Sequence, residues 1–528
     1  MITRRNFGKV TTSAGVLALT GSGTSLWAQG ERPVINVAVD NLWSNFNTIS
    51  GISTTTRRIF PNIYSVLVER DVLNDPTGVK LMPGLATEWT RDGKVWTFKL
   101  REGVKFHNGE TMTAEDVAFT LGAERLWGEK PFEPRGKTFT EGFIRVEAVG
   151  PLTVEIETEY EDPFVPGKLS GYIGFVMPKA HYLEVGVDAF GQAPIGTGPY
   201  KVVRFSSGDA LETVAFDDYW DGPPPASAVN WKIVPEFAGR LAGVVSGEFE
   251  FMVNIPTDQM AQLASYDNVS VRHELAGNYP AMVFNTLPEE GNPLIDVNLR
   301  RALVHAVDMH AITQALFGDL TIHPDVPFNF KEYGDFYDPD AKPAYPYDPE
   351  KAKALVAASD YKGEELDWHI TRQFYPNYEA AAEIMVEMFR KVGLNVRAKV
   401  LDNFQLVYER PWHIQNQSNS TEFIPGDPYR PLWLDWGPNS GRGRPDSRTY
   451  AWEPTPEYLA ASEKFLVATE FKERNEGYLE MRQAWIDYCP AMYMWQSVYN
   501  WAHTNTIEWI PRADGEMRMF GPYLQLPA

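Results

Sequence analysis

The sequence predicts an α/β fold of two or three domains, and three observations lead to this prediction. Trp96, Phe98 and Leu100 occupy alternate positions directly after an Asp92-Gly93 turn signal, which is typical of a half-buried strand. Residues 380–392 carry apolar side chains at helical spacing, and a strand-like run at 394–400 follows. About 500 residues remain after a removable leader, enough for several domains. Such alternation of helices and strands predicts sheets covered by helices.

Residues 1–28 have the features of a twin-arginine signal peptide. The pair Arg4-Arg5 precedes an apolar stretch at 10–19, and Leu26-Trp27-Ala28 is a plausible cleavage site. A basic tail or a membrane anchor is the less favoured interpretation, because an anchor needs about 20 apolar residues. Since no cysteine lies near the cleavage site, a lipid anchor is also disfavoured. We therefore expect Tat export to the periplasm.

Charge and cysteine content narrow the possible partners. The formal charge is −22, and loss of Arg4, Arg5 and Lys9 with the signal makes it −25. Such a surface repels nucleic acid and anionic lipid, so we expect neither as a partner. Cys489 is the single cysteine, so no intrachain disulfide can form and a large core must supply the stability. We expect Cys489 to be a buried structural thiol.

The segment 81–121 combines a hairpin, a second turn and a capped helix. Asn108-Gly109 marks the second turn. Thr113 and Asp116 have the spacing of a capping box, which opens a helix through Leu121. These features predict a strand–turn–strand–helix unit and no chemistry.

Further elements follow along the chain. Asp348 and Pro349 predict a helix N-terminus, and Gly393 predicts a helix C-terminus. The other predicted helix spans 299–308, and the predicted strands lie at 35–39, 146–156 around Gly150-Pro151 and 269–271.

The order of these motifs resembles one protein family. The segment 81–121, the turn Gly196-Thr197-Gly198-Pro199-Tyr200 and the element Asp218-Tyr219-Trp220 resemble signatures of the dipeptide and oligopeptide solute-binding proteins of ABC importers, known as solute-binding protein family 5. The resemblance runs in pieces from about residue 35 to 510. Each piece is weak, but their order over the whole length makes a chance match improbable.

The resemblance implies a two-lobed periplasmic binding protein of the class II-like, cluster C type, with an extra subdomain in lobe I. It places lobe I at 31–277, with the subdomain inserted at roughly 60–195, and lobe II at 278–496. Residues 497–528 are then a C-terminal return to lobe I. It also implies a hinge at 276–280 as one crossing between the lobes, a strand at 282–285 that opens lobe II, and a strand at 492–495 that carries the chain back.

The resemblance also indicates ligand-facing residues. Thr54 and Thr55 lie in a polar run that faces the ligand in the family, although an ordinary helix N-cap region is an equally good interpretation. Asn278 and Tyr279 at the hinge and Trp495 on the returning strand are further candidates.

The segment 412–420 is rich in amides and hydroxyls. Its Gln415 and Asn419 offer both donors and acceptors, and Trp412 and Trp436 can stack on a sugar or peptide plane. The alternative is a polar loop above packed tryptophans. If the segment forms the site, Trp436→Ala or Asn419→Ala weakens ligand binding without lowering the melting temperature of the unliganded protein.

The amine anchor of peptide-binding members is missing at its usual place. In the family a carboxylate stands three or four residues before an Asp-Pro or Glu-Pro pair. Here residues 423–426 precede Asp427-Pro428 and contain no carboxylate. An unpartnered buried ammonium costs about 3–5 kcal/mol, a large part of the about 8 kcal/mol of micromolar binding. Glu422 is the nearest substitute, followed by Asp402 and Asp435.

We therefore expect the solute-binding component of an ABC importer, which captures a peptide or peptide-like solute by lobe closure. An oligosaccharide or another neutral polar solute is the alternative. An exported hydrolase is the least favoured, because the sequence has no HExxH, GxSxG or CxxC motif. The expected partners are the permease and ATPase subunits at the inner membrane. We expect no cofactor, no metal and no enzymatic activity, and a monomeric protein.

Overall fold

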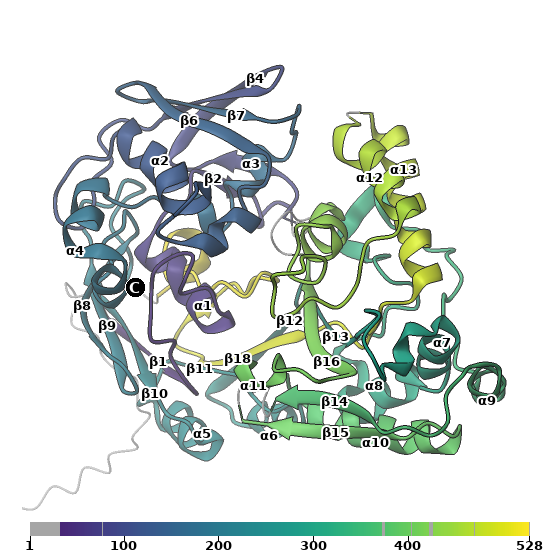
Figure 1. The fold of residues 1–528 in the computed structure, drawn as a ribbon. Helices are drawn as coiled ribbons and strands as arrows, with labels where there is room; N and C mark the ends of the chain where they lie inside the picture. The colour runs from purple at the N-terminus through teal and green to yellow at the C-terminus, as the bar shows by residue number, and fades with distance from the viewer. Residues whose placement is uncertain are drawn as a thin grey trace, which may run out of the picture.

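The computed structural model describes residues 32–526, apart from 76–77, 372–374, 403, 422–425 and 469, and the side chains of 404 and 405. The predicted twin-arginine signal and Glu422 lie outside the described residues. The fold is mixed α/β with two lobes, as predicted, and each lobe is built on its own large sheet (Figure 1).

A mixed seven-stranded sheet forms the first lobe. Its central strand β1 is parallel to the two neighbouring strands β10 and β11, and antiparallel strands extend the sheet on both sides. Because β1 is covered on both faces, its side chains from Val37 to Val39 are fully buried. In spatial order the strands are β12 (Val269–Leu275), β18 (Val498–Thr504), β11 (Phe251–Val253), β1 (Val34–Val39), β10 (Ala228–Ile233), β9 (Ala210–Ala215) and β8 (Tyr200–Ser206).

A four-stranded antiparallel sheet lies at one end of the first lobe and contains the predicted hairpin. Gly93, with a φ of 55°, makes the turn between β4 and β5. The Asp116 carboxylate accepts a hydrogen bond from the Thr113 backbone N–H at 2.8 Å, which confirms the predicted capping box. The sheet consists, in spatial order, of β4 (Ala86–Asp92), β5 (Val95–Leu100), β7 (Thr153–Thr158) and β6 (Phe143–Gly150).

A five-stranded sheet forms the second lobe. Strands β15, β14 and β16 are parallel, and β13 and β17 extend the sheet in antiparallel fashion. The strands in spatial order are β15 (Val396–Leu401), β14 (Leu366–Thr371), β16 (Ile414–Ser420), β13 (Asn278–Phe284) and β17 (Ala491–Tyr493). Two small sheets pair β2 (Val68–Arg70) with β3 (Leu81–Pro83) and β19 (Glu508–Trp509) with β20 (Leu524–Gln525).

The chain passes from the first sheet to the second between β12 and β13, and returns between β17 and β18. Two predictions are corrected here. The predicted hinge at 276–280 is too long, because Asn278 and Tyr279 already belong to β13 and pair with Ser420 and Asn419. The predicted return strand at 492–495 is also wrong, since β17 pairs with β13 in the second sheet and β18 is the strand that rejoins the first.

The helices cover the sheets, and most of their predicted ends are confirmed. The Asp348 side chain accepts from the Lys351 backbone N–H at 2.8 Å and caps α9. The predicted helix at 299–308 ends earlier, because Asp308 caps the next helix through the Ala311 backbone N–H at 3.0 Å. The helices are α1 (Thr54–Ile63), α2 (Ala114–Leu121), α3 (Val165–Lys168), α4 (Lys179–Gln192), α5 (Phe237–Ser246), α6 (Met260–Leu263), α7 (Val297–His305), α8 (Met309–Phe317), α9 (Pro349–Ala358), α10 (Tyr378–Lys391), α11 (Phe404–Val407), α12 (Pro456–Val467) and α13 (Phe471–Tyr488).

Large apolar cores stabilise both lobes. Cys489 is buried as predicted, and burial raises the pKa of its thiol to about 11, so it is protonated at neutral pH. Within the described ranges, none of the helices has the length and apolar character needed to cross a bilayer.

Candidate functional site

The two lobes touch along one side. Phe164, next to α3, stacks on Tyr429 of the second lobe with ring centroids 4.7 Å apart. The Arg474 guanidinium of α13 lies 4.2 Å from the centroid of the Phe164 ring. The Asn439 amide donates to Glu141 Oε1 at 3.0 Å. These contacts join the first lobe, which carries the four-stranded sheet, to the second lobe, which carries α12 and α13 (Figure 1).

Arginine and tyrosine side chains from both lobes gather where the sheets face each other. Arg57 of α1 donates through Nε to the Tyr172 hydroxyl at 2.6 Å. Tyr375 of the second lobe hydrogen-bonds through its hydroxyl with the Ser418 and Asn278 side chains. Burial raises the pKa of Tyr499 on β18 to about 12, with Arg57 lowering it and Tyr375 raising it. We call Arg57, Tyr172, Tyr375 and Tyr499 the tyrosine cluster.

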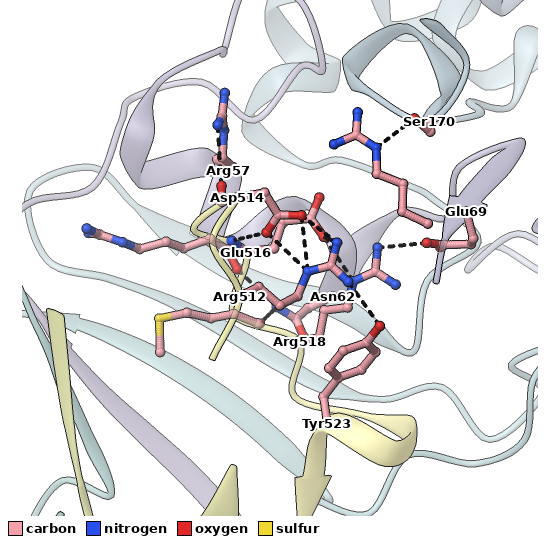
Figure 2. A network of polar contacts seen from close by, with 12 residues as sticks. Arg57, Asn62, Glu69, Ser170, Arg512, Asp514, Glu516, Arg518 and Tyr523 are labelled. Carbon is pink, nitrogen blue, oxygen red and sulfur yellow. Dashed lines mark hydrogen bonds and ion pairs between the residues drawn. The ribbon is translucent and has the colours of Figure 1, made fainter. Parts of the chain in front are cut away.

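A buried network of ion pairs and hydrogen bonds links α1 to the C-terminal segment and to β2 (Figure 2). Arg518 pairs with Glu69 at 2.8 Å and with Glu516 at 2.9 Å. Arg512 pairs with Asp514 through Nε at 3.1 Å, and the Asp514 carbonyl accepts from Arg57 Nη1 at 3.3 Å. The C-terminal segment therefore connects α1 with β2 and fixes the helix that carries Arg57 of the tyrosine cluster.

The amide-rich segment 412–420 contains strand β16 and is not the polar loop that the alternative interpretation predicted. β16 lies between β14 and β13, and Gln415 and Asn419 are fully buried on it. Asn419 Nδ2 donates to the Pro431 carbonyl at 3.1 Å. Neither amide atom of Gln415 has a hydrogen-bond partner among the described residues. Buried amides are costly unless water or a ligand completes their hydrogen bonds.

The three candidate tryptophans lie in packed cores, which argues against the expectation that Trp412 and Trp436 stack on a solute. Trp436 is fully buried, with the rings of Trp452 and Trp485 at 5.6 and 5.2 Å. Trp495 packs against Phe317 and Tyr378. Trp412 is 2% exposed and lies under the guanidinium of Arg410 at 4.8 Å. From the sequence, a large aromatic ring in a polar segment can either pack in a core or stack on a solute, and only the tertiary packing distinguishes these two roles.

The remaining candidates fall into different places. Thr54 is the exposed first residue of α1, and Thr55 donates to Asn41 Oδ1 at 3.0 Å, so this run is the N-terminus of a helix capped by Ser53. The Tyr279 hydroxyl donates to Glu332 Oε1 at 2.7 Å. Asn278 is the candidate that contacts the tyrosine cluster, through Tyr375.

The alternative amine anchors also differ. Asp402 is exposed. Asp435 lies 4.0 Å from Arg430 Nε, and its backbone carbonyl accepts from Arg442 Nη1 at 2.9 Å. Burial raises the pKa of Asp435 while Arg430 and Arg442 lower it. Because two arginines already balance this carboxylate, it is a poor anchor for an ammonium.

Sequence reasoning did not identify Arg57, Tyr172, Tyr375 or Tyr499 as site residues. Each stands in a different element, and no local spacing connects them. A hollow of about 980 Å³ lies elsewhere, between α10 and β15. All of its lining residues come from the second lobe, so lobe closure cannot act on a solute held there.

Comparison with known proteins places the chain among extracellular binding proteins. Residues 80–441 match the family model described as bacterial extracellular solute-binding proteins, family 5 Middle. The chain is 26% identical over 385 residues to the oligopeptide-binding protein AppA of Bacillus subtilis, covering 69% of this chain and 68% of that protein. It is 29% identical over 341 residues to heme-binding protein A of Haemophilus influenzae, covering 59% of this chain and 60% of that relative. The structure of AppA in complex with a nonapeptide has a TM-score of 0.79 at 21% identity, covering 94% of this chain and 100% of AppA.

Proposed function

The chain belongs to the bacterial extracellular solute-binding proteins of family 5, and we propose that it captures a peptide or peptide-like solute between its lobes and delivers it to the permease of an ABC importer. The observation that carries this proposal is a cluster of side chains from both lobes, in a chain that crosses between the two sheets twice. Few connections between lobes are what hinge closure around a ligand requires.

The names of the relatives support a peptide first. AppA is an oligopeptide-binding protein, and its solved structure contains a nonapeptide. Since another relative is named for heme, membership of the family does not select one solute. Tyrosine hydroxyls and buried amides also suit the hydroxyl groups of an oligosaccharide, which remains the second candidate. For a peptide, Glu422 is the proposed amine anchor, because it is the carboxylate nearest in sequence to the usual anchor position before Asp427-Pro428.

We also propose the domain boundaries and cellular context. Lobe I spans 31–277 with a subdomain at roughly 60–195, lobe II spans 278–496, and 497–528 return to lobe I. The leader at 1–28 directs twin-arginine export to the periplasm. There the protein acts as a monomer, without a cofactor and without chemistry of its own, and the permease and ATPase subunits complete transport.

Solute binding can be tested with a matched pair of tyrosine variants. Tyr375→Ala removes a side chain of the tyrosine cluster that hydrogen-bonds Ser418 and Asn278. Tyr347→Ala removes a tyrosine of the same lobe that is 48% exposed. Calorimetry with di- to nonapeptides and with oligosaccharides identifies a solute for the wild type. We expect Tyr375→Ala to bind it at least tenfold more weakly and Tyr347→Ala to bind it normally.

Small-angle scattering with the same compounds tests closure. A bound solute should lower the radius of gyration and raise the melting temperature. Chemical turnover of any bound compound, or the absence of both responses across the whole panel, would contradict the proposed function.

A further inference from the structure

A cavity of about 190 Å³ lies between the two lobes and is lined by three arginines. Arg135 comes from the short helix η2 (Pro134–Thr138) of the first lobe. Arg430 and Arg442 come from the second lobe, Arg430 at the start of the π-helix η8 (Arg430–Leu434). Asp435 is the one carboxylate among the described lining residues, so the formal charge of the wall is +2, three positive charges less one. We call this space the arginine cavity.

The positive charge of Arg442 is satisfied mainly by neutral groups. Its Nε donates to Gln417 Oε1 at 2.7 Å, Nη1 to the Asp435 carbonyl at 2.9 Å, and Nη2 to the Ser418 carbonyl at 2.7 Å. Arg442 is only 5% exposed, and these three hydrogen bonds hold its guanidinium in one orientation. Burial lowers the pKa of Arg442, and Arg430 lowers it further while Asp435 raises it.

The wall of the arginine cavity also presents an unused donor. Gln417 lines the cavity and is 8% exposed. Its Oε1 is occupied by Arg442, and its Nε2 has no hydrogen-bond partner among the described residues. Arg135 reaches the Ile52 carbonyl only at 3.4 Å. The cavity therefore combines positive charges with an amide donor that needs an acceptor.

We propose that the arginine cavity binds a carboxylate of the solute, so that the transported compound is an organic acid. A carboxylate has two oxygens that accept several hydrogen bonds, and arginine recognises it with parallel N–H donors. An ammonium group in the same place faces net positive charge. This inference rests on the proposed function, and it selects acids from among the peptides and sugars considered there.

The position of the cavity also connects the carboxylate to closure. Arg135 belongs to one lobe, whereas Arg430 and Arg442 belong to the other. Without an anion, closing brings like charges together, and Arg430 lowers the pKa of Arg135 in addition to burial. A carboxylate between them replaces repulsion with attraction in the closed form only. Such a difference between open and closed states is what allows a ligand to drive closure.

The test compares free acids with their neutral amides. The probes are di- and tripeptides with a free C-terminal carboxylate, the same peptides as C-terminal amides, and succinate with succinamide. Binding is measured by calorimetry and melting temperature in the full chain. Arg135→Gln removes a cavity charge whose hydrogen bond to the Ile52 carbonyl is long. Arg390→Gln is the matched control, because Arg390 is exposed on α10 and pairs there with Glu387.

We expect the wild type to bind at least one acid tenfold or more tightly than its amide. Arg135→Gln should remove that preference, and Arg390→Gln should keep it. Asp435→Asn keeps the backbone carbonyl that accepts from Arg442 and removes the negative charge, so it should tighten binding of the acid. Added salt should weaken acid binding more than amide binding.

Equal binding of acid and amide, or an unchanged preference in Arg135→Gln, would overturn this inference. Binding of a neutral solute with closure would also overturn it while leaving the proposed function in place. Failure of every acid, amide and neutral solute to bind would count against both.

Discussion

At the scale of single residues, His107 is held neutral by the turn that the sequence identified at Gly196. Its Nδ1 accepts from the Gly196 backbone N–H at 3.3 Å, and its Nε2 donates to the Gly198 carbonyl at 3.0 Å. Only the neutral ring can accept and donate in this way. Burial lowers the pKa of His107 to about 4, although the Gly198 hydrogen bond opposes this.

We therefore predict acid sensitivity that depends on His107. Above pH 6.5 the ring is neutral in both folded and unfolded chains, so stability is complete. Between pH 6.5 and about 4 the unfolded chain binds the proton first, and stability falls by up to about 3 kcal/mol. Urea unfolding of His107→Gln should give lower stability at pH 7 and a flatter loss on acidification. The exposed His273→Gln should behave like the wild type, and an equally steep loss in His107→Gln would contradict the prediction.

Trp436 gives a second prediction at this scale. Because its ring is fully buried against Trp452 and Trp485, Trp436→Ala should lower the free energy of unfolding by about 3–5 kcal/mol. This reverses the expectation from sequence that stability stays unchanged. Trp43→Ala, at a position 46% exposed, is the control and should cost far less. Denaturant unfolding of the two variants measures the difference, and an unchanged stability of Trp436→Ala would restore the ligand-stacking interpretation.

At the scale of elements, the C-terminal segment depends on its buried charges. Although burial alone raises the pKa of Asp514, Arg512, Arg518 and Arg70 together hold it well below its usual range. Asp514→Asn leaves buried arginines without this partner and should cost about 3–5 kcal/mol.

The stability supplied by Asp514 is complete above the pKa of an unfolded aspartate and is lost as the pH falls toward the folded value. Asp209→Asn breaks an exposed pair with Arg204 at 3.1 Å and should cost less than about 1 kcal/mol. Thermal unfolding of both variants provides the comparison. A small cost for Asp514→Asn would show that neighbouring carboxylates compensate.

At the scale of the whole molecule, lobe closure can be trapped chemically. Glu141 and Asn439 meet across the lobes at 3.0 Å. The double variant Glu141→Cys, Asn439→Cys, joined by a short bismaleimide, should exclude solute when cross-linked empty and retain it when cross-linked loaded. Cys489 is buried with a raised pKa and should not react.

Calorimetry before and after cross-linking measures solute access in this double variant. Each single cysteine variant, treated in the same way, is the control and should bind normally. Normal exchange of solute in the cross-linked protein would show that closure does not gate the site.

Local sequence rules predicted much of the fold because each acts within a few residues. The Asp92-Gly93 hairpin, the Thr113–Asp116 capping box and the Asp348 cap are all present. The pairing of strands that are distant in the sequence was harder to predict from such local rules. The resemblance indicated a strand at 492–495 that returns to the first lobe, but such a short motif does not specify which sheet the strand joins, and β17 joined the second.

By itself the sequence determined the fold class, the family, and where many turns and helix ends lie, since these depend on short-range chemistry and on motif order. Only the tertiary structure decided which polar residues share a site. Arg57, Tyr375 and Tyr499 are separated by more than a hundred positions along the chain, and strand pairing places them near one another. It also assigned Trp436 to a core, because burial depends on neighbours that the local sequence does not name.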